Sequence, residues 1–353
     1  MTTLVTVGMN YLIDPYGIFG SPTWAAINEK KPAAANRTHI VKPYAVKRDN
    51  YAVIIVGNSR PQMGLDPDHP CIQSIGSAYS LTLPGAGVYQ QARYLQHALS
   101  YSQPKLIILG IDFIDFLISP NEKNDPYRWP PYTDKFEERL AVDPQGRRNF
   151  NYFKSKIFDY RDSLFSLITT KDSIQTIKTQ NLQFSSTLNS NGYNPANDYF
   201  EIIKHEGQHM LFKQKNEELL ETLTRSKWQI IQNNVPWSSP LTSLNKIIEE
   251  ATSREIRLIV FINPYHADYI KNIITASQEN NFKQWKIIIE ELVVKKNHLE
   301  FWDFSVINAY TSESPPQPND KKTILNWFWE PAHYRKELGD KLLDQMLAKN
   351  GCA

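Results

Sequence analysis

The sequence predicts an α/β fold with three layers, α/β/α, around a mainly parallel sheet. Short apolar runs at residues 51–56, 105–110 and 256–262 alternate with helical patterns of ten or more residues. This alternation is typical of parallel strands joined by crossover helices. A chain of 353 residues is long enough for one large domain of this kind or for two ordinary ones.

Composition and charge exclude several classes of protein. The chain has 39 lysines and arginines against 37 acidic residues, a formal net charge of +2, without a long block of one sign. This balance gives no argument for nucleic acid as a partner. The two cysteines, Cys71 and Cys352, are too few for a disulfide framework or a cysteine-rich metal site, and Cys352 is expected to be a terminal thiol. We predict no cofactor.

The first buried strand, at residues 51–56, runs into a tight turn that carries Ser59. The strand is rich in β-branched residues, as expected of a parallel strand covered on both faces. Gly57 permits a sharp exit that leaves Ser59 at the carboxyl end of the strand, where open α/β sheets place their chemistry. An ordinary loop serine would satisfy the same pattern, so the decision depends on residues downstream.

The alternation of predicted strands and helices continues after Ser59. Tyr89, Ala92, Leu95 and Leu99 recur at helical spacing. The elements predicted in this part are a turn-rich passage at 61–70, a short strand at 77–83 closed by Pro84–Gly87, a helix at 88–99, and a strand at 105–110 followed by Asp112 and Asp115.

A helical insertion is predicted at about residues 119–235. It begins with a proline-rich stretch at 119–150, whose aromatic residues between Tyr127 and Tyr132 would pack in a loop or stack on sugar rings. Helices are expected around 154–167 and 217–232, separated by a polar stretch at 184–197.

The alternation of helices and strands resumes after the insertion and completes the main domain, residues 51–350. The elements predicted there are a helix at 241–253, a strand at 256–262, helices near 267–278 and 282–294, a strand near 299–304, and an amphipathic helix at 336–348.

Residues 1–50 are predicted to be an N-terminal arm. The stretch from 14 to 50 is rich in Pro, Gly, Ala and Asn and has no sustained period, which predicts an extended course over the domain surface. Residues 3–9 are apolar, but polar residues follow well short of the roughly 20 apolar residues that cross a bilayer. We therefore expect the arm to be the remnant of a longer upstream anchor, or residues 3–13 to contact a membrane surface.

Ser59 becomes a candidate nucleophile because Glu330 and His333 stand just before the last helix. A serine hydroxyl needs an imidazole to take its proton, and the imidazole needs a group that orients it. A carboxylate three residues before the histidine can face the same ring. The backbone N–H groups of Ser59 and Gly85 would supply two donors to a developing oxyanion.

Four short blocks follow one another along the chain: Gly57-Asn-Ser59, Leu81-Thr-Leu-Pro-Gly85, Leu109-Gly-Ile-Asp112 and Glu330-Pro-Ala-His333. Their order resembles the SGNH (GDSL-like) hydrolase and acyltransferase superfamily. More narrowly, it resembles a group of bacterial SGNH-like proteins that follow a membrane anchor. The resemblance spans about residues 10–350 and implies an SGNH or flavodoxin-like sheet with a serine nucleophile.

Two positions depart from the family pattern. Asp112 stands where the family has an asparagine that donates to the oxyanion, and an ionised carboxylate there would repel it. We expect Asp112 to be turned away, paired with Arg60, or protonated. Glu330 replaces the usual aspartate and is one methylene longer. Asp303, at a predicted strand end, is the alternative partner for His333.

A second enzyme hypothesis comes from His205-Glu-Gly-Gln-His209, which matches the His-Glu-x-x-His pattern of zinc metallopeptidases. On a helix the two imidazoles would share a face and bind zinc, while Glu206 would activate water. Gly207 weakens the helix where the motif needs rigidity. His266, after another predicted strand, is expected to have a packing role.

The preferred interpretation is an esterase or O-acyltransferase that acts on acyl esters of carbohydrate, cell-envelope polymer or lipid. By resemblance it would be extracytoplasmic, in the periplasm or cell envelope. Ser59 would form the acyl-enzyme and His333 would act as general base and then general acid. The alternative from a different class is a non-catalytic binding module on the same fold, with Asp112 marking the loss of the oxyanion site.

Overall fold

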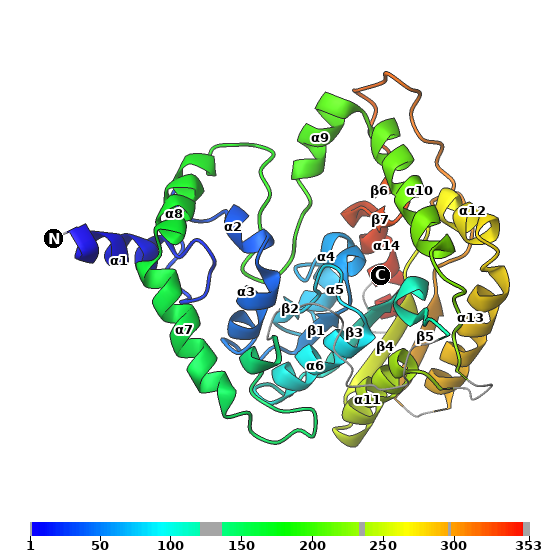
Figure 1. The fold of residues 1–353 in the computed structure, drawn as a ribbon, viewed down its shortest axis with the longest axis horizontal. Coiled ribbons are helices and arrows are strands. Elements are labelled where there is room, and N and C mark those ends of the chain that lie inside the picture. Colours follow the sequence, from blue (N-terminus) through cyan, green and yellow to red (C-terminus); the bar gives the residue numbers. More distant parts are fainter. Residues whose placement is uncertain (1, 121–135, 233–236, 296–297, 349–353) are drawn as a thin grey trace.

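In the described residues, 2–120, 136–232, 237–295 and 298–348, a computed structural model has one central sheet of five parallel strands, in the order β2-β1-β3-β4-β5 (Figure 1). The strands are β1 (Val53–Val56), β2 (Ala78–Ser80), β3 (Leu106–Ile111), β4 (Arg257–Ile262) and β5 (Leu299–Asp303). Helices cover both faces of this sheet. The predicted three-layer α/β/α fold is therefore confirmed.

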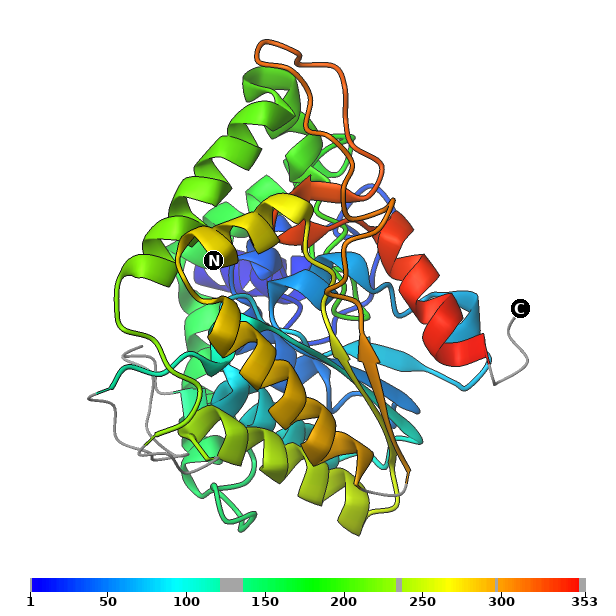
Figure 2. The same ribbon diagram turned by 90° about the vertical axis from the view of Figure 1, so that its right-hand side faces the viewer.

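Alternate side chains along each strand divide the core into two parts. Ile54 and Val56 belong to one hydrophobic cluster, whereas Val53 and Ile55 belong to the other. The first cluster includes residues of α6 (Val88–Leu99), α11 (Ser239–Ser253), α12 (Ala267–Thr275) and α13 (Glu279–Val294), and the second includes α5 (Pro70–Gln73) and α14 (Lys336–Leu347). Figure 2 shows α14 on one side of the sheet and α11 with α13 on the other. Since both faces are buried, the strands are continuous apolar runs.

The segment from 14 to 50 is not an extended arm. It contains α2 (Pro32–Ala35) and α3 (Thr38–Ala45), and α1 (Thr2–Ile13) precedes it. Tyr16, Val41 and Tyr44 form a separate small core with Leu188. Helices α7 (Asn151–Phe165) and α8 (Leu167–Thr179) of the insertion pack against α1, so the two regions form one helical layer (Figure 1).

The insertion contains more helices than the two that the sequence predicted there. The described part holds η2 (Phe136–Arg139), α7, α8, α9 (Asp198–Glu206) and α10 (Gln208–Thr224). The predicted helix at 217–232 was wrong in its bounds, because α10 begins and ends earlier in the chain. The loop aromatics between Tyr127 and Tyr132 lie outside the described residues.

In the described part of the chain, no helix is both long and apolar enough to cross a bilayer.

Lys42 of α3 provides a test of how the N-terminal layer is held to the sheet. Its buried amino group donates to the carbonyl oxygens of Ser80 (2.9 Å), Thr82 (2.5 Å) and Gly192 (2.8 Å). We predict that Lys42→Met lowers the free energy of unfolding by about 2–4 kcal/mol, because three buried carbonyls lose their donor. Urea denaturation measures this. The exposed Lys105→Met serves as control, and equal stability of the two variants would contradict the prediction.

Candidate active site

The turn that carries Ser59 is built around a glycine. Gly57 follows β1 with φ of +151°, and a Cβ there would lie 2.5 Å from the Cγ of Pro61 and 2.8 Å from the carbonyl oxygen of Gly110. Only glycine fits this conformation and this close approach. The chain then enters helix α4 (Ser59–Gly64) at the serine itself. The predicted turn-rich passage is therefore helical at its start.

Asn58 fixes the start of α4. Its side-chain oxygen accepts a hydrogen bond from the backbone N–H of Arg60 at 3.0 Å, as an N-cap residue does. Its amide nitrogen donates to Asp112 at 2.5 Å and to Asp115 at 3.1 Å. One side chain thus ties the serine turn to the end of β3.

His333 lies in a small antiparallel pair of strands, β6 (Phe328–Glu330) and β7 (His333–Tyr334), in which it is the register partner of Glu330. Tyr334 packs against α4 so closely that a Cβ at Gly64 would overlap its ring. Gly339 of α14 approaches the Gly64 carbonyl in the same way. These two contacts hold β7, which carries His333, and α14 directly against α4, which begins at Ser59.

The three residues predicted to act together are in contact. Ser59 Oγ lies 2.7 Å from His333 Nε2, although the two residues are 274 positions apart. His333 Nδ1 is hydrogen-bonded to Glu330 Oε1, and the other carboxylate oxygen accepts from the Ala332 N–H at 2.8 Å. Glu330 is buried, whereas Ser59 and His333 are partly exposed. The glutamate is therefore enclosed by the protein, whereas the serine is accessible to solvent.

The electrostatics of the triad favour proton transfer from serine to histidine. Burial raises the pKa of Glu330, but the charge of His333 and its hydrogen bond outweigh burial, and the net pKa is lowered. Glu330 is therefore ionised at neutral pH. An ionised carboxylate at Nδ1 holds the neutral ring with its proton on Nδ1, which leaves the lone pair of Nε2 for the Ser59 hydroxyl.

The predicted pairing of Asp112 with Arg60 is present in the structure. Arg60 Nη1 lies 2.7 Å from Asp112 Oδ1, and both side chains are buried. The atoms form an ion pair without hydrogen-bond alignment. The guanidinium also lies 4.6 Å from the ring centres of Tyr265 and Tyr269. Burial would lower the pKa of Arg60, but Asp112 and these tyrosines raise it, so the arginine remains charged.

The second oxygen of Asp112 is held by two asparagines. Oδ2 accepts from Asn58 Nδ2 at 2.5 Å and from Asn263 Nδ2 at 3.3 Å. Asn263 in turn accepts from the Tyr334 hydroxyl at 3.1 Å. One oxygen of the Asp112 carboxylate is thus paired with Arg60, and the other accepts two hydrogen bonds.

Asp115 is a member of the site that the sequence did not single out. It lies in the 3-10 helix η1 (Phe113–Phe116) and accepts hydrogen bonds from Asn58 and, at 3.4 Å, from Gln91. Burial, reinforced by the charge of Asp112, raises its pKa to about 8. Asp115 therefore carries a proton at neutral pH. No spacing in the sequence marks it, because its partners come from the turn before α4 and from α6.

No protein-family model matches the sequence, and no curated protein is significantly similar to it. The chemistry of the site is therefore argued from its own contacts.

Gly85 is placed on the same edge of the sheet as Ser59. The segment after β2 continues alongside the serine turn, since the Leu83 N–H donates to the Gly57 carbonyl at 2.9 Å. Gly85 is exposed, with φ of +69°, and a Cβ there would meet no atom within 4 Å. Its proposed role as an oxyanion donor stays a prediction.

The alternative partner for His333 was wrong. Asp303, at the end of edge strand β5, forms an ion pair with Lys286 at 2.5 Å and accepts two hydrogen bonds from Ser305. Glu330 occupies the position beside the imidazole instead. His266 has the packing role that was expected: it caps α12, and its ring packs against Phe212.

The zinc hypothesis does not fit the local structure. Gly207 has φ of +84° and separates α9 from α10, so His205 and His209 are on different helices. His205 faces Glu201 at 3.6 Å, and both Glu206 and His205 are exposed. His209 lines an open pocket of about 480 Å³ between α10, α12 and Pro315–Pro318, to which Ser59 and His333 do not contribute. The rigid helical face that the motif requires is absent from these described residues.

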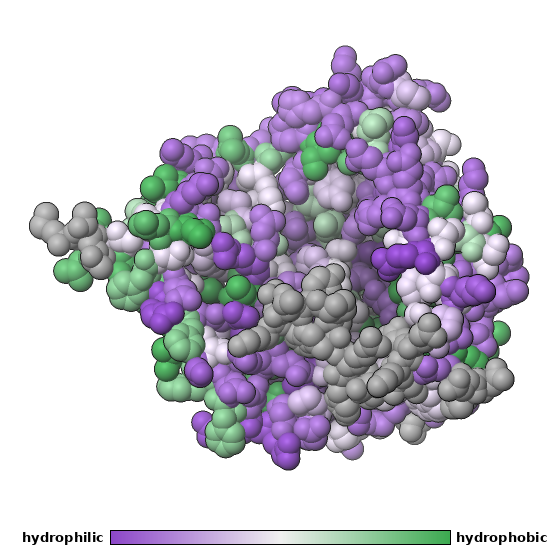
Figure 3. Space-filling view, viewed as in Figure 1, coloured by the Kyte–Doolittle hydropathy of each residue, from purple (hydrophilic) through white to green (hydrophobic). Residues whose placement is uncertain are grey.

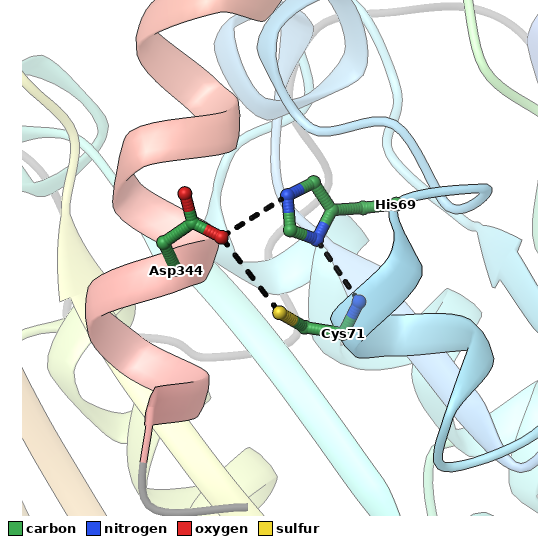
Figure 4. Close-up of side chains that lie close together, drawn as sticks. All are labelled: His69, Cys71 and Asp344. Atoms are coloured by element: carbon green, nitrogen blue, oxygen red, sulfur yellow. Dashed lines mark hydrogen bonds and ion pairs between the residues drawn. The ribbon is translucent and has the colours of Figure 1, made fainter. Parts of the chain in front are cut away.

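A group of potential metal ligands does occur elsewhere, at the contact between α5 and α14 (Figure 4). His69 Nε2 lies 3.5 Å from Asp344 Oδ1, and the sulfur of Cys71 lies 3.7 Å from the same oxygen. Cys71 is disulfide-bonded, and Cys352 lies outside the described residues. His69 Nδ1 accepts from the Cys71 N–H and so caps α5. With neither a thiolate nor that nitrogen available, the group is a helix-to-helix contact rather than a metal site.

Asp115 makes the stability of the protein depend on pH. Its pKa of about 8 in the folded state exceeds the ordinary value of 3.8, so between these values the folded state holds one more proton than the unfolded state. Stability should therefore fall as the pH rises from 5 to 8. We predict that wild type loses up to about 1.4 kcal/mol per pH unit relative to Asp115→Asn, which lacks this proton.

Urea denaturation of both proteins at pH 5, 6.5 and 8 measures the difference. The exposed Asp49→Asn is the matched control, for which the difference from wild type should not vary with pH. A constant difference between wild type and Asp115→Asn would contradict the raised pKa.

Proposed function

We propose that the chain is a serine esterase or O-acyltransferase in which Ser59, His333 and Glu330 form the catalytic triad. The observation that carries the proposal is the hydrogen bond of 2.7 Å between Ser59 Oγ and His333 Nε2, with Glu330 on the opposite nitrogen. A serine on the surface has no need of an imidazole held by a buried carboxylate. The arrangement has the geometry of an activated nucleophile.

The chemistry follows from the positions of the protons. His333 Nε2 takes the proton of Ser59 as Oγ forms a bond to the acyl carbon of an ester. The same nitrogen then protonates the leaving alcohol, and the acyl group remains on Ser59. Water or the hydroxyl of an acceptor repeats the sequence in reverse and releases the acyl group. Glu330 stays ionised and stabilises the imidazolium that forms at both stages.

The surroundings of Asp112 support an intact oxyanion site. The Ser59 N–H and, by resemblance, the Gly85 N–H are the proposed donors of that site. Asp112 was the sign of a decayed site, but its charge is paired with Arg60, and its second oxygen accepts two hydrogen bonds. The negative charge of Asp112 is thereby compensated, which favours an enzyme over a binding module.

The proposed substrates are acyl esters of carbohydrate, envelope polymer or lipid, and the proposed location is extracytoplasmic. Both follow from the resemblance of the sequence blocks.

Labelling by a fluorophosphonate probe tests the nucleophile. We expect wild type to form a covalent adduct, and peptide mass spectrometry to find it on Ser59. Ser59→Ala should abolish labelling, and His333→Ala should slow it by at least about a hundredfold because the general base is lost. The exposed Ser77→Ala should label like wild type. An adduct elsewhere, or none, would reject the triad.

Asp112→Asn separates the enzyme from the binding module. The variant restores the donor that the resemblance predicts, yet it leaves the buried Arg60 without its counter-charge, which costs about 3–5 kcal/mol of stability. For an enzyme, we expect reduced but measurable turnover of p-nitrophenyl acetate and a lower unfolding temperature. If wild type shows neither turnover nor labelling and Asp112→Asn gains both, the natural protein is a binding module.

A further inference from the structure

Helix α8 buries small polar residues and exposes several apolar ones. Its buried residues are Thr169, Ser173, Thr176 and Thr179. Among its exposed residues, Leu167 is 80 % exposed and Ile168 is 62 % exposed, followed by Ile174 and Ile177. A helix on the surface of a water-soluble domain has the reverse arrangement.

Helix α7 follows the same pattern. Its one buried residue is Ser163, and the side chains of Phe153, Ile157 and Phe165 are all more than half exposed. These three residues recur at spacings that keep them near one side of the helix. Tyr152 and Tyr160 pack toward the small N-terminal core instead.

Helix α1 joins this layer through a polar contact. Asn10, fully buried, donates to the Leu164 carbonyl at 2.9 Å and to Thr170 at 3.2 Å, and it accepts from Ser173 at 3.1 Å. Leu4, at 78 % exposed, lies on the outside of the same helix. Small polar side chains between helices, with apolar side chains outside, are typical of helices that meet in lipid.

Because α7 and α8 both pack against α1, we group the exposed apolar residues of the three helices under one name, the apolar face. It is made of Leu4, Val5, Leu12, Phe153, Ile157, Phe165, Leu167, Ile168, Ile174 and Ile177. Figure 3 shows hydrophobic residues along the left margin of the molecule, where Figure 1 places α1, α7 and α8. Exposed apolar side chains gathered on neighbouring helices mark a contact surface.

The charges beside the apolar face are mainly positive. On α7 and α8 the exposed cations are Lys154, Arg161, Lys171 and Lys178, whereas Asp162 is the one exposed carboxylate of these two helices. Two other carboxylates of the layer, Asp159 and Asp172, are turned to Arg139 and Tyr16. An apolar surface with basic residues among its apolar side chains is complementary to anionic lipid headgroups above acyl chains.

We propose that the apolar face docks the protein on an anionic lipid surface. The phenylalanine, leucine and isoleucine side chains enter the headgroup region, and the lysines contact the phosphates. The sequence pointed only to residues 3–13 as a membrane contact. The structure adds α7 and α8, which lie 138 or more positions later in the chain (151 − 13) and hold the larger part of the face. This inference does not depend on the chemistry of Ser59.

Vesicle flotation tests the proposal with the full chain. The vesicles contain phosphatidylcholine alone or with 30 % phosphatidylglycerol. We expect wild type to float with the anionic vesicles, and the variant Phe153→Ser/Leu167→Ser/Ile168→Ser to bind them at least tenfold more weakly. The matched control is Ile274→Ser/Ile287→Ser/Val294→Ser, which changes three exposed residues of α12 and α13 and should bind like wild type.

The lysines are tested separately. Lys154→Gln/Lys171→Gln/Lys178→Gln should bind anionic vesicles no better than wild type binds phosphatidylcholine alone. Hydroxyl-radical footprinting of wild type provides a measurement that needs no variant, and anionic vesicles should protect Phe153 and Leu167 from oxidation but not Ile287.

Three results would overturn the proposal. Wild type that stays in the aqueous layer has no affinity for lipid, and equal binding by the two serine variants would place the contact elsewhere. A dimer in light scattering that only the α7–α8 variant dissociates, without vesicle binding, would assign the apolar face to a second copy of the chain.

Discussion

The carboxylate of Asp112 is the group on which the arrangement of the site depends. A buried charge is costly unless it is paired and hydrogen-bonded, and Asp112 is fully buried. Arg60, Asn58 and Asn263 meet this requirement, and they come from α4, from the turn before it and from the end of β4. Satisfying this one carboxylate therefore fixes three segments at the carboxyl edge of the sheet, including the turn that presents Ser59.

The same network explains how residues far apart in the chain meet accurately. Asn263 continues the chain of hydrogen bonds from Asp112 to Tyr334, the neighbour of His333. On the other side of β7, glycines at 64 and 339 allow α4, α14 and the Tyr334 ring to touch without intervening side chains. Polar contacts set the position of β7, which carries His333. Close backbone packing keeps α4, which begins at Ser59, against it.

The sequence predicted the central sheet because parallel strands are continuous apolar runs, and it predicted the triad because the residue types and their order are distinctive. It did not predict Asp115 or Asn263, whose importance comes from partners on other strands. Residues 14–50 were expected to be extended because their helices are short and one contains Pro43. What holds them is distant in sequence: the backbone N–H groups of Lys30 and Lys31 bond to Gln180 and Thr187. Contacts across about 150 residues leave no local pattern.

The buried carboxylates also set the charge that a reacting group at Ser59 would experience. If Asp112 and Asp115 were both ionised, Arg60 would compensate only one of them, and the remaining charge would oppose an oxyanion in a region of low dielectric. Because burial and the charge of Asp112 raise the pKa of Asp115, it holds its proton at neutral pH, and the group as a whole is neutral. A carboxylate at position 112 is therefore compatible with the proposed acyl transfer, since its charge is balanced by Arg60 and the neighbouring Asp115 is uncharged.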